Sequence, residues 1–183
     1  MHLIDRCLPD YQFSETHWLE SAACPVRLMT EAVKYRPDDD RFFRYAIQLR
    51  ELPMRLFQRS AANGKANFGM DNFTLLHRDG DTEVVYGLAG KFWQADYGQA
   101  HLADGEAFQH FCEPGSVKLA INFTCQRLES GLTRMTTHTR VHCVDRQALR
   151  RFTPYWYAIR PVSGMIRRRM LQAIARRSLE SGH

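Results

Sequence analysis

The chain has 183 residues, 44% of them hydrophobic, and a formal net charge of +5 with a pI near 9.1. Its five cysteines are widely spaced, odd in number and form no CxxC motif, so the sequence indicates neither a zinc ribbon nor a disulfide framework. No window approaches the roughly 20 apolar residues of a membrane span, and the N-terminal residues MHLIDRCLPDY carry charges where a signal peptide needs an apolar run. We therefore expect a soluble, unprocessed, cytoplasmic protein with a single domain over residues 1–183.

The first third of the chain predicts one strand and two short helices. Residues 11–21 (YQFSETHWLES) alternate loosely between apolar and polar side chains and are rich in strand formers. Pro25 stands at the start of a helix in which apolar pairs recur every four residues, and Pro37 ends that helix. The acidic residues of PDDDRFFRYAIQLREL cap a second predicted helix, and residues 59–69 (RSAANGKANFG) predict a loop.

Strands dominate the second half of the chain. The segments NFTLLHRD and EVVYGLAGKFW predict a hairpin around the turn DGDT. The segments SVKLAINFTCQRLE and LTRMTTHTRVHCV predict a second hairpin around the turn SG, with strands long enough to cross a sheet. Between the two hairpins, DGEAFQHF predicts one or two helical turns.

A long helix is predicted after Asp145, a natural N-cap residue. Apolar or aromatic side chains follow at spacings of three or four, at Ala148, Phe152, Tyr155/Trp156, Ile159, Val162, Ile166, Met170 and Ile174. The side chains expected to face the sheet are Phe152, Trp156, Ile159, Ile166 and Met170, and those expected to face solvent are Arg151, Arg168, Arg169 and Arg176. Pro154 and Pro161 predict a bend or a break near RPVSG rather than a straight rod.

Positive charge is concentrated in this last part of the chain. From Arg140 to Arg177, ten arginines accompany one acidic residue, Asp145. Such a run fits a nucleic-acid surface, an anionic membrane, or a solvated helix face paired with the acidic body. The charges wrap around the apolar stripe, and no aromatic residues alternate with them in the manner of single-strand binding. We expect salt bridges to the acidic body first, transient membrane contact second, and no nucleic-acid partner.

The order of a strand, two helices, antiparallel strands and a long helix resembles the START-like superfamily, also called SRPBCC or helix-grip. The segments that are similar to an uncharacterised bacterial branch of it are FSETH, LRELP, VVYGLAGKFW, EPGSVKLAINF, TTHTRVHCVD, RRFTPYWYAIRPVSG and IRRRML. The resemblance implies an α+β fold in which a curved antiparallel sheet grips the C-terminal helix over a hydrophobic cavity. That branch brings no established activity with it.

A hydrophobic ligand is the leading expectation from this resemblance. The residues expected to contact it are Phe92, Trp93, Phe123, Met135, Thr137, Thr139, Tyr155, Trp156 and Ile159, and Tyr157 is expected beside them. Large rings with polar tips suit a site that binds an apolar ligand and anchors one end of it. The same residues equally suit a filled core. We expect a carrier for a lipid or an aromatic, polyketide-like molecule, with a structural or interaction module as one alternative.

An enzyme of the cyclase or aromatase type is the other alternative. Glu15 and His17 share one face of the first strand, which in the helix-grip topology pairs with the last strand near Thr137, Thr139 or Arg140. Carboxylate, imidazole and hydroxyl groups there could transfer protons, or could form a structural polar cluster. No nucleophile elbow, Gly-rich phosphate loop or pair of acids supports catalysis.

A metal or cofactor is not expected. His138 and His142 have the spacing that brings two ligands together on a helix, but they lie on a predicted strand. There they stand about 13 Å apart, at about 3.3 Å per residue, which is too far for one metal ion. The oligomeric state is not predicted by the sequence.

Overall fold

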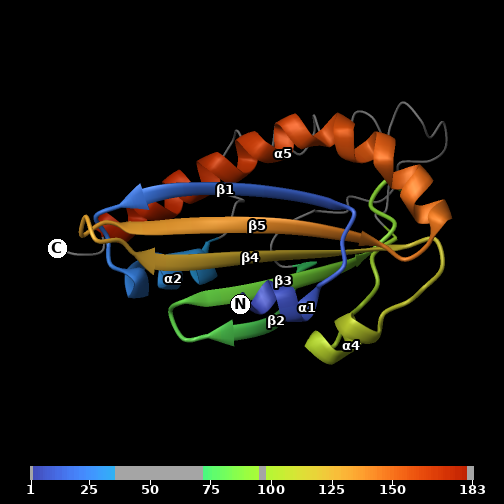
Figure 1. Ribbon diagram of the computed structural model, residues 1–183, viewed down its shortest axis with the longest axis horizontal. Helices are drawn as coiled ribbons and strands as arrows, with labels where there is room; N and C mark the ends of the chain where they lie inside the picture. The colour runs from blue at the N-terminus through green and yellow to red at the C-terminus, as the bar shows by residue number, and fades with distance from the viewer. Residues whose placement is uncertain (1, 36–71, 95–97, 181–183) are drawn as a thin grey trace.

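The computed structural model describes residues 2–35, 72–94 and 98–180. It is an α+β fold in which five antiparallel strands form one sheet, in the order β1-β5-β4-β3-β2, and a long C-terminal helix lies over one face (Figure 1). The strands are β1 (Phe13–Ser21), β2 (Thr74–Asp79), β3 (Glu83–Gly90), β4 (Val117–Arg127) and β5 (Thr133–Cys143). The helices are α1 (Leu3–Cys7), α2 (Pro25–Lys34), α4 (Gly105–His110) and α5 (Arg146–Glu180). The predicted second helix and the loop at 59–69 lie outside the described residues.

Alternation along β5 defines the two faces of the sheet. Every odd-numbered residue of this strand is buried and every even-numbered residue is half-buried. Met135 and Val141, on the buried side, pack with residues of α5, so we call this side the helix face. The other side, the outer face, is covered in part by α1 and α4, because Ile4 and Phe108 pack there against β3 and β4. The predicted strands and both hairpins are therefore confirmed.

Helix α2 also packs on the helix face of the sheet. It begins at Pro25, where the missing N–H costs no hydrogen bond, as the sequence predicts. Leu28, Met29 and Ala32 occupy one side of α2 and are almost fully buried against β4, β5 and the second half of α5. These contacts fix the C-terminal half of α5 against the sheet.

Helix α5 begins where Asp145 caps it, as predicted. The Asp145 carboxylate accepts hydrogen bonds from the backbone N–H of Ala148 and of Gly115, both at 2.7 Å, and these bonds lower the pKa of Asp145. The helix then continues for 35 residues through Pro154 and Pro161 and arches over the sheet (Figure 1). Of the predicted bend or break, the structure therefore shows a bend without a break. Both prolines are exposed, where the carbonyl groups that lose their helical partners can bind water instead.

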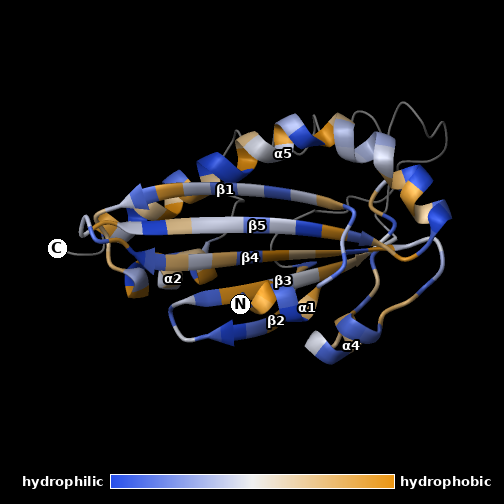
Figure 2. Ribbon diagram, in the orientation of Figure 1, coloured by the Kyte–Doolittle hydropathy of each residue, from blue (hydrophilic) through white to orange (hydrophobic). Residues whose placement is uncertain are grey.

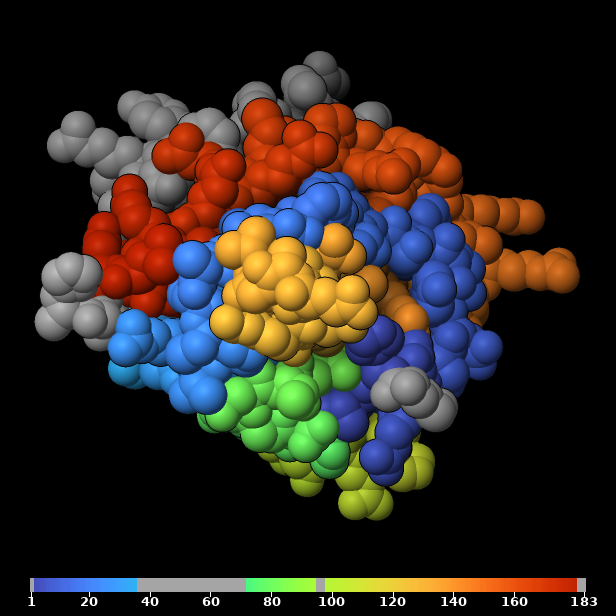
Figure 3. Space-filling model, turned by 60° about the vertical axis from the view of Figure 1, so that its left-hand side comes forward, coloured from blue at the N-terminus to red at the C-terminus, as the bar shows by residue number. Residues whose placement is uncertain are grey.

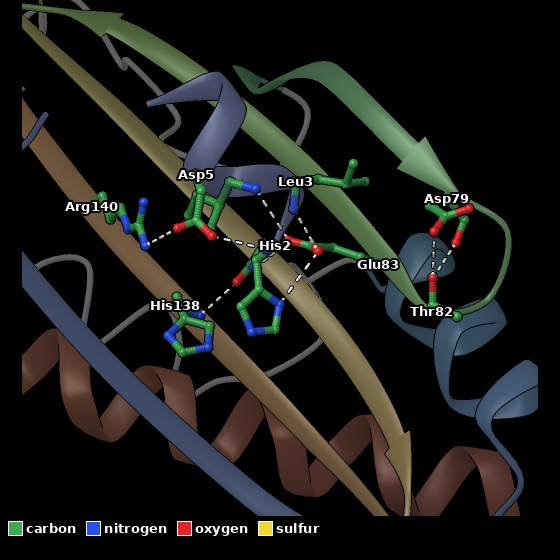
Figure 4. A network of polar contacts seen from close by, with 10 residues as sticks. His2, Leu3, Asp5, Asp79, Thr82, Glu83, His138 and Arg140 are labelled. Carbon is green, nitrogen blue, oxygen red and sulfur yellow. Dashed lines mark hydrogen bonds and ion pairs between the residues drawn. The ribbon is translucent and has the colours of Figure 1, made fainter. Parts of the chain in front are cut away.

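The N-terminal helix α1 is held on the outer face by a buried carboxylate (Figure 4). Glu83 of β3 accepts hydrogen bonds from the backbone N–H of Leu3 at 2.8 Å and from the side-chain amide of Asn122 at 2.6 Å. Asp5 of α1 pairs with Arg140 of β5 at 2.6 Å, and this hydrogen bond lowers the pKa of Asp5. These bonds fix α1 over the middle of the outer face.

Candidate functional site

The pairing of β1 with β5 brings together the polar residues that the sequence singled out. Glu15 lies directly opposite Thr139, and His17 lies directly opposite Thr137. Residues directly opposite each other in a sheet share a face, so all four point to the helix face. The expectation that the first strand pairs with the last is confirmed. We call Glu15, His17, Thr137 and Thr139 the central polar site.

Two apolar clusters flank this site beneath α5. One cluster contains Met135 and Phe123 together with Met170, and the other contains Val141 and Phe152. Along β5, the two threonines of the central polar site therefore separate one cluster from the other. A polar belt inside an apolar layer is the arrangement expected where a mainly apolar ligand is oriented by a few polar groups.

Glu15 and His17 form a tight pair at this belt. The His17 Nε2 atom lies 2.8 Å from Glu15 Oε1, and each side chain is only 12% exposed. The carboxylate thereby fixes the orientation of the imidazole ring. In the space-filling view, β1 (blue) lies directly beneath α5 (orange to red), so the helix covers this edge of the sheet (Figure 3).

Gly164 of α5 makes this close approach possible. A Cβ atom at this position would lie 2.9 Å from Glu15 Oε1 and 3.6 Å from His17 Nε2. The first distance is shorter than a normal van der Waals contact, so any other residue would displace the Glu15 carboxylate. Sequence reasoning missed Gly164, although a lone glycine inside a long predicted helix is itself a signal of close packing.

The Thr137 hydroxyl is the unsatisfied group of the site. Its oxygen is buried without a hydrogen-bond partner among the described residues, and the residue is 1% exposed. An unpaired buried hydroxyl costs about 1–3 kcal/mol, and such groups are rare in native proteins. Because Thr137 lies opposite His17, a ligand atom between them could bond to both.

A groove opens beside the site, at the edge of the sheet between β1 and α5. Its volume is about 360 Å³, and its lining residues are Thr16, His17, Trp18, Leu19, Arg168, Leu171 and Gln172. His17 therefore belongs both to the groove and to the central polar site. A second pocket, of about 420 Å³, lies on the outer face between α1, β2 and α4. Neither pocket is lined by any of the nine residues expected to contact the ligand.

The predicted aromatic residues instead pack on one another and on their neighbours. The ring of Phe152 lies 5.3–6.3 Å from the rings of Phe13, Trp93, Tyr155 and Trp156. The predicted set divides between the two clusters, with Phe92, Trp93, Tyr155, Trp156 and Ile159 in one and Phe123 and Met135 in the other. Tyr157, expected beside them, is 62% exposed and points away from the sheet, so that prediction is wrong. Whether the others touch a ligand remains a prediction.

The two histidines of β5, His138 and His142, lie on the outer face. His138 Nδ1 is 3.0 Å from Thr16 Oγ1, and His142 Nδ1 is 3.0 Å from the carbonyl oxygen of Asp10. Burial, and then the neighbouring positive charges, lower the pKa of His138. Within the described ranges, no three histidine, cysteine or acidic side chains come together as a metal site.

Comparison with known proteins gives no family for the chain. No protein-family model and no curated protein matches it. No helix in the described ranges has an apolar stretch that could cross a membrane. The function therefore has to be argued from the central polar site and its surroundings.

Proposed function

We propose that this protein belongs to the uncharacterised bacterial branch of the START-like (SRPBCC) superfamily and carries a small hydrophobic molecule between the sheet and α5. The ligand has an apolar body and one hydrogen-bonding group, which binds at the central polar site. The observation that carries the proposal is the buried Thr137 hydroxyl, which has no partner in the described residues and lies opposite His17. A ligand oxygen would satisfy this hydroxyl and contact the imidazole.

The surroundings of the site suit such a ligand. Small-molecule sites are typically apolar, with a few convergent polar groups and a volume of about 300–1,000 Å³. The groove beside His17, at about 360 Å³, is within that range and has Leu19 and Leu171 among its lining residues. The five cysteines are all free, which supports a reducing, cytoplasmic location.

A second candidate function is proton transfer on the bound ligand, as in a cyclase or aromatase. The observation that favours it is the 2.8 Å hydrogen bond between Glu15 and His17 at 12% exposure. In this reaction His17 would accept or deliver the proton, while Glu15 holds the ring in one tautomer. The two functions use the same site and differ only in whether the ligand is changed.

Native mass spectrometry of the purified protein, followed by displacement of a fluorescent fatty-acid probe, tests the carrier function. Thr137→Val keeps the shape of the side chain and removes the hydroxyl, so it should weaken binding of the acid probe at least severalfold more than binding of its methyl ester. Thr136→Val, one residue away on the outer face, is the matched control and should leave both affinities unchanged. If no apolar compound is retained and neither probe binds, the proposal fails.

Deuterium incorporation into the retained compound separates the two candidate functions. The ligand is incubated with the protein in D₂O and its mass is followed over time. An enzyme exchanges a carbon-bound proton, and His17→Gln should abolish this exchange. A carrier binds the compound and leaves its mass unchanged.

A further inference from the structure

The solvent-facing side of α5 carries a high density of positive charge. The helix contains nine arginines and a single acidic residue, Glu180. Seven of these arginines are exposed: Arg146, Arg150, Arg151, Arg160, Arg168, Arg169 and Arg176. The expectation that Arg151, Arg168, Arg169 and Arg176 face solvent is thus confirmed. In the space-filling view, side chains from the first part of α5 (orange) extend well away from the body (Figure 3).

Part of this charge has no ion-pair partner among the described residues. The prediction that the arginines form salt bridges with the acidic body is confirmed for Arg140, which pairs with Asp5. It does not hold for four exposed arginines of α5, which form no ion pair with any residue in the described ranges: Arg146, Arg150, Arg160 and Arg168. Arg176 pairs only within the helix, with Glu180 at 3.8 Å. Within the described ranges the predicted pairing is therefore absent for these four, and their charge is open to a partner.

Exposed apolar residues run between the arginines. We call the line formed by Pro154, Ala158, Pro161 and Met165 the crest; all four are exposed, and Met165 is 45% exposed. Their spacing of four, three and four residues places them on one side of the helix. Arginines 150 and 151 lie about 100° apart around the axis, on either side of this line, as do arginines 168 and 169.

The crest lies on the side of α5 that faces away from the sheet, because all four of its residues are exposed. Beside the crest, Tyr157 is 62% exposed, so an aromatic ring adds to the apolar surface there. Apolar segments alternate with hydrophilic ones along the top of the arch in Figure 2. An apolar line flanked by arginines is typical of helices that lie in the interface of an anionic bilayer. There the guanidinium groups bind lipid phosphates and the apolar side chains enter the headgroup region.

We propose that the outer side of α5 docks reversibly on a membrane surface rich in anionic phospholipids, with the crest buried among the headgroups. A membrane fits better than nucleic acid because the surface is a convex arch with one exposed aromatic ring, Tyr157. Binding of single strands instead uses a groove with a series of stacking rings. The proposal does not depend on what the central polar site binds.

Co-sedimentation with phosphatidylcholine vesicles, with and without phosphatidylglycerol, tests the docking. Each arginine near an anionic surface contributes about a fivefold factor to partitioning, so three substitutions should lower it about a hundredfold. The test variant is Arg150→Gln/Arg160→Gln/Arg168→Gln. The control variant, with the same change of net charge at exposed positions elsewhere, is Arg6→Gln/Arg27→Gln/Arg78→Gln. Only the test variant should lose most of its binding to the anionic vesicles.

The crest is tested separately from the charge. Met165→Asp should lower partitioning further and should do so at high salt, where the arginine contribution is screened. Circular dichroism is the control for folding, and each variant should give the same spectrum as the unsubstituted protein. Equal loss in the two triple variants, or equal binding to neutral and anionic vesicles, would overturn the proposal. The proposal would also be overturned if the protein bound a single-stranded oligonucleotide more tightly than the anionic vesicles and only the test variant lost that binding. Such a result would assign the surface to nucleic acid.

Discussion

The contact between Gly164 and Glu15 makes a quantitative prediction about α5. Replacing glycine by alanine inside a helix stabilises it by about 1 kcal/mol. Here the added Cβ atom would lie 2.9 Å from Glu15 Oε1, so the carboxylate has to move away from His17. Loss of a charged hydrogen bond costs about 1.5–3 kcal/mol. Gly164→Ala should therefore lower the free energy of unfolding by about 1 kcal/mol, instead of raising it.

The same substitution should have the opposite effect when Glu15 is absent. In a Glu15→Ala background no carboxylate obstructs the Cβ atom, and Gly164→Ala should stabilise the protein by about 1 kcal/mol. Urea unfolding of the four proteins of this double-mutant cycle then gives a coupling energy of about 2 kcal/mol. Met165→Ala, at the adjacent exposed position, should show no coupling to Glu15. If Gly164→Ala has the same effect in both backgrounds to within about 0.5 kcal/mol, α5 does not pack on Glu15.

Three further predictions concern the core, the outer face and the cysteines. Ile174→Ala removes a fully buried side chain and should lower the free energy of unfolding by about 2–5 kcal/mol. Ile166→Ala, at a half-buried position, should lower it less. If urea unfolding shows a larger loss for Ile166→Ala than for Ile174→Ala, the orientation of α5 is wrong. Because the pKa of His138 is below 6.5 in the folded protein, the unfolded chain binds more protons as the pH falls through 6.5, and stability decreases there. His138→Gln should reduce that decrease, and an unchanged pH slope in urea unfolding would contradict this reasoning. Cys24 is exposed and should react rapidly with an alkylating reagent. Burial raises the pKa of Cys125 to about 12, so the Cys125 thiol should react only when the protein unfolds. Mass spectrometry of the alkylated protein, with and without urea, measures both reactions.

Local sequence patterns were sufficient for most of the fold. Gly80 and Gly131 in the two hairpin turns adopt positive φ angles, 47° and 83°, which favour glycine. They connect strands that alternate in burial or are buried on both faces. Pro25 and Asp145 begin their helices for reasons that lie within the first turn of each. Each of these features depends only on residues within a few positions of it in the sequence, which is why the sequence alone predicts it.

The features that the sequence did not reveal depend on contacts between distant segments. Helix α1 was not predicted, since a five-residue helix is stabilised here by Glu83, which lies 80 residues away from Leu3. Ile166 falls on the apolar stripe by spacing and is only half-buried, because the orientation of an arched helix changes along its length. The role of Gly164 likewise depends on β1, which packs against α5 from the other end of the chain.

The central polar site also predicts a conflict between stability and binding. The Thr137 hydroxyl is buried without a partner in the described residues, so it destabilises the protein when no ligand is bound. Valine has the same shape and a higher preference for buried strands, so Thr137→Val should raise the free energy of unfolding by about 1–2 kcal/mol. The same variant should bind the acid probe more weakly. Stability and affinity measured on one preparation test both effects, and Thr136→Val on the outer face is again the control. If Thr137→Val destabilises the protein, the hydroxyl has a structural partner and is not reserved for a ligand.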